Sequence, residues 1–95
     1  MNMNNQILIV DDVLNNIQVA MSILQEDNYE LAFASSGAEA LELVKDEQFD
    51  LILLDLMMPN MDGFEVCQKL KENENTRAIP IIFLTAKTDV DSITQ

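Results

Sequence analysis

Two strand-like runs in this chain each end in aspartate. The run Gln6–Val10 is followed by Asp11 and Asp12, and the run 51–54 is followed by Asp55. The second run, Leu-Ile-Leu-Leu, is continuously apolar, which is typical of a strand covered on both faces of a parallel sheet. Because ligands of such sheets bind beyond the carboxyl ends of the strands, we expect the three carboxylates to lie together.

Three clustered carboxylates repel one another unless protons or a cation neutralise them. Mg²⁺ favours sites that are built from oxygen ligands, so the sequence predicts an acidic pocket whose chemistry is assisted by this bound ion. An isolated pair such as Asp11 and Asp12 is more simply explained as stabilising the positive end of the next helix. The second run that ends in Asp55 favours the metal site instead.

The composition limits both the size of the fold and the kind of partner. The chain has 95 residues, 48% of them hydrophobic, and a net charge of −12 from 17 acidic and 5 basic residues. One small domain is therefore expected, and its negative charge argues against direct binding to nucleic acid or to anionic lipid. No stretch is long enough to span a membrane, and the N-terminus does not resemble a signal peptide. A cytoplasmic location is expected.

The chain contains no histidine and only one cysteine, Cys67. An internal disulfide is therefore excluded, and the residues for a zinc site or a Ser-His-Asp triad are missing. Cys67 falls in an apolar helical stripe, where it is expected to pack.

Apolar periodicity predicts that strands and helices alternate along the whole chain. The expected strands are Gln6–Val10, 29–34, 51–54 and Ile81–Leu84. Helices are expected at about 17–27, at about 38–47 and between Asp62 and Asn73, and the tail 89–95 could begin another. This alternation implies right-handed crossovers and a doubly wound α/β fold, with helices on both faces of a parallel sheet.

Capping residues and apolar stripes define the expected helices more closely. Asn15 or Asn16 is expected to cap the first helix, whose buried face comprises Ile17, Ala20, Met21 and Leu24. Asp62 and Glu65 have the spacing of a capping box for the third helix. The buried face expected for that helix comprises Phe64, Cys67 and Leu70.

Three motifs, each at the end of a predicted strand, resemble those of the receiver domain of bacterial two-component response regulators. They are Ile9-Val10-Asp11-Asp12, Leu54-Asp55-Leu56-Met57-Met58-Pro59-Asn60-Met61-Asp62-Gly63 and Phe83-Leu84-Thr85-Ala86. The resemblance covers essentially all of the chain and implies a flavodoxin-like sheet with about four strands in the order 2-1-3-4.

The resemblance also implies a role for each site residue. Asp55 would accept a phosphoryl group from a histidine kinase or a histidine phosphotransfer protein, and Thr85 would hydrogen-bond that group. Asp12 would bind Mg²⁺ directly and Asp11 mostly through water, with Asp55 and the backbone carbonyl of Met57 as the other protein ligands. Such a domain works in a phosphorelay and is not an enzyme in the usual sense.

A complete receiver continues with a fourth helix, a fifth strand that ends in a phosphate-binding lysine, and a fifth helix. Residues 1–95 are therefore expected to be the N-terminal portion of a single receiver domain, with impaired switching, and Lys87 is not assigned the role of that lysine. Ile81–Leu84 would then be an unpaired edge. We expect self-association through this edge or by exchange of elements.

Two other functions stay open at this point. A phosphohydrolase that forms an aspartyl phosphate typically has a second aspartate two residues after the first, and Met57 occupies that position. A receiver-like interaction module that is not phosphorylated is the main alternative.

Among nearby residues, Asp62 is expected to cap a helix rather than bind metal. The thioethers of Met57, Met58 and Met61 are expected to pack rather than to form a soft-metal site.

Overall fold

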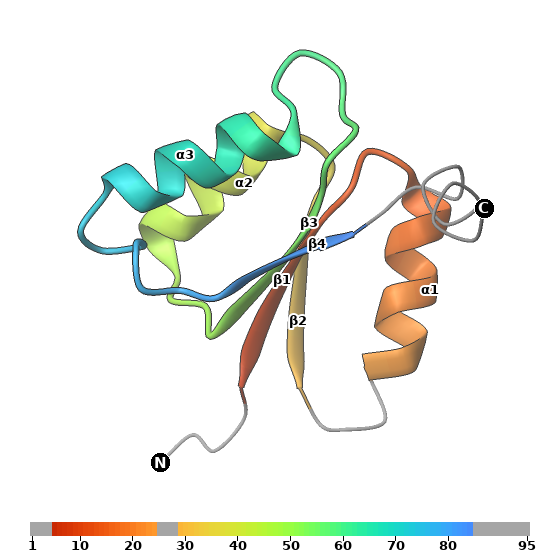
Figure 1. Ribbon diagram of the computed structural model, residues 1–95. Coiled ribbons are helices and arrows are strands. Elements are labelled where there is room, and N and C mark those ends of the chain that lie inside the picture. The colour runs from red at the N-terminus through yellow and green to blue at the C-terminus, as the bar shows by residue number, and fades with distance from the viewer. Residues whose placement is uncertain (1–4, 25–28, 85–95) are drawn as a thin grey trace, which may run out of the picture.

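The computed structural model describes residues 5–24 and 29–84, which form one sheet flanked by helices (Figure 1). The elements follow in the order β1 (Gln6–Val10), α1 (Leu14–Leu24), β2 (Glu30–Ala34), α2 (Gly37–Asp46), β3 (Leu51–Asp55), α3 (Gly63–Glu72) and β4 (Ile81–Leu84). All four predicted strands are present, with bounds within one residue of those expected. The tail 89–95, for which a helix was suggested, lies outside the described residues.

The four strands are parallel and lie in the order β2-β1-β3-β4. Helix α1 covers one face of the sheet, and α2 and α3 lie side by side on the other (Figure 1). The doubly wound α/β fold and the order 2-1-3-4 are thus confirmed. None of the helices in the described part of the chain is long and apolar enough to cross a membrane.

The two faces of the sheet are covered unequally. On the face of α2 and α3, Ile52 and Leu54 of β3 are completely buried. On the other face α1 packs over Ile7 and Ile9 of β1, and the β3 residues Leu51 and Leu53 are only partly buried. We expected β3 to be buried on both faces, and this is confirmed in full only on the face of α2 and α3. On the opposite face the single described helix, α1, lies over β1 and leaves β3 partly exposed.

Helix α1 begins earlier than the sequence predicts. It starts at Leu14, so Asn15 and Asn16 lie inside the helix, and the expectation that either is its cap is wrong. The chain turns into the helix at Asp11 instead, whose Oδ1 accepts a hydrogen bond from the backbone N–H of Val13 at 2.9 Å. The expected inner face is confirmed, with Ile17 buried and Ala20, Met21 and Leu24 partly buried against β1.

Helix α3 has the predicted cap but a different buried face. Asp62 is the N-cap, and its Oδ1 accepts a hydrogen bond from the N–H of Glu65 at 2.9 Å. Phe64 was expected to be buried but is 65% exposed. The buried face carries Gly63, Val66 and Leu70, and Phe64 is rotated away from it by about 100° because it follows Gly63 by one residue. Cys67 is partly buried against the core, as expected.

Candidate metal centre

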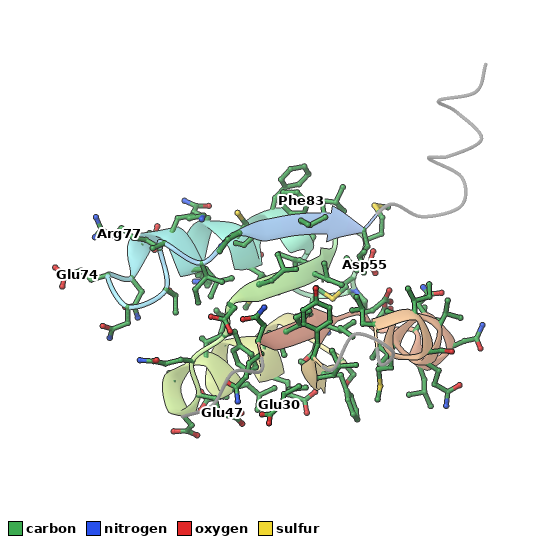
Figure 2. The ribbon with its side chains drawn as sticks, turned by 90° about the horizontal axis from the view of Figure 1, so that it is seen from below. Glu30, Glu47, Asp55, Glu74, Arg77 and Phe83 are labelled. Carbon is green, nitrogen blue, oxygen red and sulfur yellow. The ribbon has the colours of Figure 1, made fainter. Side chains whose placement is uncertain are left out.

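Three carboxylates meet where β1 and β3 end. Asp55 is the last residue of β3, and Asp11 and Asp12 directly follow β1. The parallel register pairs Val10 with Leu54, which brings the two strand ends side by side. One carboxylate oxygen from each of Asp11, Asp12 and Asp55 lies within 4.8 Å of the others. Figure 2 shows Asp55 near the end of the sheet at which β4 also terminates.

The three carboxylates differ in burial and in how firmly they are held. Asp11 is 2% exposed and Asp55 is 7% exposed, whereas Asp12 is exposed. The Oδ2 of Asp11 accepts a hydrogen bond from the side-chain amide of Asn16 at 3.1 Å, in addition to the bond from Val13. Oδ1 of Asp55 accepts a bond from the N–H of Met57 at 3.2 Å. Two carboxylates are therefore fixed in the wall of the site, and the third lies at its opening.

Asn16 is a site residue that the sequence reasoning missed. Asn16 is expected from the sequence to be a possible helix cap, whereas in the structure it lies in the first turn of α1 and its side-chain amide donates a hydrogen bond to Asp11. The spacing of Asp11 and Asn16 could have indicated this contact, because an aspartate that turns the chain into a helix lies next to residues of the first helical turn. Recognising it required the correct start of α1.

Burial is the main reason why the pKa of Asp55 is raised from its ordinary value of 3.8 to about 6. The neighbouring charges of Asp11 and Asp12 raise it further, and the hydrogen bond from the Met57 N–H acts in the opposite direction. The carboxylate of Asp55 is thus unfavourable in this environment unless its charge is offset. A divalent cation that is bound by oxygen ligands would provide that compensation, and the ligand set fits Mg²⁺.

The loop between β3 and α3 forms one side of the site. Gly63 closes this loop by donating its N–H to the carbonyl of Leu56 at 3.0 Å. Met58 is buried and Met61 is partly buried against the core, which confirms that these thioethers pack. Met57 does not: its side chain is 68% exposed, so the expectation that it packs is wrong.

Other predicted site residues have different positions. Asp62 caps α3, as expected, and is not part of the carboxylate cluster. Thr85, expected to bind the phosphoryl group, and Lys87 lie outside the described residues. The structure thus brings together Asp11, Asp12 and Asp55, with the backbone of Met57 beside Asp55. Their roles as metal ligands and phosphoacceptor stay predictions.

The sequence matches a known protein family along almost its whole length. The sequence model of one protein family, the response regulator receiver domain, matches residues 7–95. The chain is 44% identical over 84 residues to the response regulator PleD of Caulobacter vibrioides, covering 88% of this chain and 18% of PleD. It is 46% identical over 85 residues to the transcriptional regulatory protein SrrA of Staphylococcus aureus, covering 90% of this chain and 34% of SrrA. The chain therefore spans at most about a third of these relatives.

Solved structures show the same fold. The N-terminal domain of a response regulator receiver protein from Methanoculleus marisnigri superposes with a TM-score of 0.83 and 41% identity, covering 86% of this chain and 67% of that one. The receiver domain of a sensor histidine kinase from Pseudomonas aeruginosa gives a TM-score of 0.83 and 30% identity, covering 90% and 70%. That second structure is described with a magnesium ion coordinated in its active-site cleft.

Proposed function

Since the chain belongs to the response regulator receiver domain family, we propose that Asp55 accepts a phosphoryl group from a phosphohistidine. The donor is a histidine kinase or a histidine phosphotransfer protein. The observation that carries this proposal is the meeting of Asp11, Asp12 and Asp55 within 4.8 Å at the carboxyl end of the sheet. The domain acts as a phosphoacceptor in two-component signalling and not as an enzyme with its own substrate turnover.

The same residues would hold the metal ion that phosphoryl transfer requires. Asp12 and Asp55 would bind Mg²⁺ directly, Asp11 mostly through water, and the carbonyl of Met57 would complete the protein ligands. The fit is supported by the oxygen-only ligand set and by the raised pKa of Asp55, which burial and two neighbouring carboxylates produce. When bound, the ion offsets negative charge on the phosphoryl oxygens during transfer.

The chain's own groups position the nucleophile. The N–H of Met57 holds Oδ1 of Asp55, which fixes the orientation of the carboxylate. One carboxylate oxygen attacks the phosphorus and forms a P–O bond as the P–N bond to the donor imidazole breaks. The electron pair of that bond remains on the imidazole nitrogen, which then takes a proton. The hydroxyl of Thr85 would donate a hydrogen bond to a phosphoryl oxygen.

Self-association through β4 is a further part of the proposed behaviour. Ile82 on β4 is 52% exposed, and its register partner Leu53 is only partly buried on the same face of the sheet. β4 is the outermost of the described strands on its side of the sheet, and apolar side chains beside such a strand favour pairing with a second chain. The exposed position of Ile82 makes it the residue with which to test this proposal.

A small phosphodonor tests the phosphoacceptor role directly. The chain is incubated with acetyl phosphate and Mg²⁺, and its intact mass and its modified peptide are measured. We expect one phosphoryl group, on Asp55, that requires Mg²⁺ and is absent from Asp55→Asn. An Asp12→Asn variant keeps the nucleophile and should be phosphorylated more slowly, because it lacks a proposed metal ligand.

Two results would contradict the proposal. One is an adduct that forms equally on the Asp55→Asn variant, since Asp55 would then not be the acceptor. The other is the absence of any adduct on the unmodified chain, which would favour an interaction module that is not phosphorylated. Continuous hydrolysis of a phosphate ester by the chain would instead indicate a phosphohydrolase.

A further inference from the structure

A groove lies between α2 and α3, away from the carboxylate cluster. Its volume is about 1070 Å³, and its lining extends from Ala38 near the start of α2 to Asp50, just before β3 begins. Figure 2 shows Glu47 just after α2, and it shows Glu74 and Arg77 on the connection from α3 to β4. The groove lies between these two parts of the chain. Asp55 is at the other end of β3, so the groove is separate from the site described above.

Apolar side chains form part of the inner surface of the groove. The most buried residues that line it are Leu70, Thr76 and Phe49, which are 2%, 4% and 5% exposed, and the hydroxyl of Thr76 donates a hydrogen bond to the carbonyl of Leu70. The partly buried apolar side chains that also line it are Leu41, Val44, Met61 and Ile79. A volume of this size is enough for several apolar side chains of another molecule, because pockets for organic ligands range from about 300 to 1,000 Å³.

The rim of the groove is predominantly acidic. Its exposed carboxylates are Glu42, Asp46, Glu47 and Asp50. Two lysines also line it, Lys45 and Lys69, and Lys45 forms an ion pair with Glu42 at 3.1 Å. Helices α2 and α3 both end beside the groove, with C-caps at Glu47 and Asn73, and helix C-termini carry partial negative charge. The surroundings therefore favour a cation.

We propose that this groove docks a cationic amphipathic segment of a partner protein. The apolar side of the segment would fill the floor over Phe49 and Leu70, and its lysines or arginines would face the carboxylates of the rim. A second copy of this chain fits the groove less well because its net charge is −12. A segment bound here leaves Asp55 accessible, and the proposal does not depend on whether Asp55 is phosphorylated.

A pair of synthetic peptides tests the docking. The first is an amphipathic helix of about 14 residues made of lysine and leucine, a length at which a helix becomes marginally stable alone. The second has the same composition in an order that removes the apolar face. Each is titrated into the isotopically labelled chain, and backbone amide shifts are followed by NMR. We expect the first peptide to shift residues 41–50 and 69–79 and to bind about tenfold more tightly than the second.

Charge-reversal variants locate the interaction. The double variant Asp46→Lys/Glu47→Lys should weaken the amphipathic peptide about tenfold, because it places cations where the rim is acidic. Cations at the end of α2 also favour the helix, so the fold should be kept. The matched control Glu65→Lys/Glu72→Lys makes the same change in net charge on exposed α3 residues that do not line the groove. It should weaken binding much less.

Four outcomes would overturn the proposal. Equal binding of both peptides, or equal weakening by both double variants, would show attraction to the overall negative charge only. Shifts centred away from residues 41–50 and 69–79 would place the peptide elsewhere. Concentration-dependent shifts at these residues without peptide would show that a second copy occupies the groove. The peptide comparison on the unmodified chain decides the matter even if a variant fails to fold.

Discussion

Asp55 is subject to two opposing demands in the metal-free protein. To act as a nucleophile or a metal ligand it must be ionised, yet it is buried beside Asp11 and Asp12. Burial and these charges raise its pKa to about 6, so near neutral pH the folded protein contains an unfavourable carboxylate. A residue kept for function at the expense of stability is common at functional sites.

This conflict predicts that Asp55→Asn stabilises the metal-free protein. The amide has the same shape and can still accept the hydrogen bond from the Met57 N–H. At about pH 7.5 with a chelator present, we expect the free energy of unfolding to rise by about 1–2 kcal/mol, as measured by urea denaturation. The variant should also lose the phosphoryl adduct.

The pH dependence of this gain follows from the direction of the pKa shift. The folded-state pKa of Asp55 lies above 3.8, so the folded state binds a proton more tightly than the unfolded state. The unmodified protein should therefore lose stability through this group as pH rises from about 4 to about 6. The advantage of Asp55→Asn should be smaller at about pH 5 than at 7.5. A variant that is destabilised at both pH values would contradict this account.

Asn60 carries local backbone strain in the loop that follows Asp55. Its φ is +71°, and the N–H of Met61 bonds the carbonyl of Pro59 across it at 2.7 Å, which is the pattern of a γ-turn. Asn tolerates positive φ better than residues with larger or apolar Cβ substituents do. We expect Asn60→Ala to lower the free energy of unfolding by about 1 kcal/mol and Asn60→Gly to cost much less. Equal losses in thermal or urea unfolding would show that φ is not the cause.

At the scale of elements, α3 is docked directly onto the strand end that carries Asp55. A Cβ atom at Gly63 would collide with the backbone carbonyl oxygen of Asp55 and would lie 2.8 Å from the Cα of Leu56. Backbone atoms at a strand end cannot move without moving the strand. The position of Asp55 therefore depends on the absence of a side chain at residue 63.

Gly63→Ala should destabilise the protein and weaken the binding of Mg²⁺. Overpacking of this kind costs about 1–3 kcal/mol, and here the displaced atoms belong to the site. Gly37→Ala is the comparison variant on α2, because its Cβ would meet side-chain atoms of Val66 and Met61 at 2.6 and 2.9 Å and not backbone atoms of the strand that carries Asp55. Urea denaturation and Mg²⁺ titration should show that Gly37→Ala affects stability without a comparable loss of Mg²⁺ affinity. Equal losses of Mg²⁺ affinity in the two variants would contradict the coupling between residue 63 and the carboxylate site.

The strands were predictable because each is a short apolar run, and the parallel sheet then brings Asp55 beside Asp11. The errors concern helix faces and helix starts. The spacing of Phe64 and Leu70 is compatible with one apolar face of a helix, yet Val66 and not Phe64 faces the core. The reason is that Gly63 packs against the end of β3, which fixes the rotation of α3. The contact between Asn16 and Asp11 could not be derived from periodicity, since it depends on where α1 begins. Both errors reflect tertiary contacts that propensity does not encode.

At the scale of the molecule, and within the described residues, the sheet is better covered by α2 and α3 than by α1 (Figure 1). This asymmetry leaves Ile82 half exposed, so we predict that Ile82→Lys shifts the chain toward the monomer in sedimentation at high concentration. Val19→Lys is the control, because Val19 is 54% exposed on the outer side of α1. A chain that is fully monomeric before substitution, or equal effects of both variants, would contradict self-association through β4.

The central claim is that Asp11, Asp12 and Asp55 act as one site for a divalent cation. Titration of Mg²⁺ into the labelled chain, followed by amide NMR, tests it most directly. We predict saturable shifts centred on residues 11–13 and 55–57, with binding at least about tenfold weaker in Asp12→Asn. Shifts elsewhere, or unchanged binding in that variant, would contradict the claim.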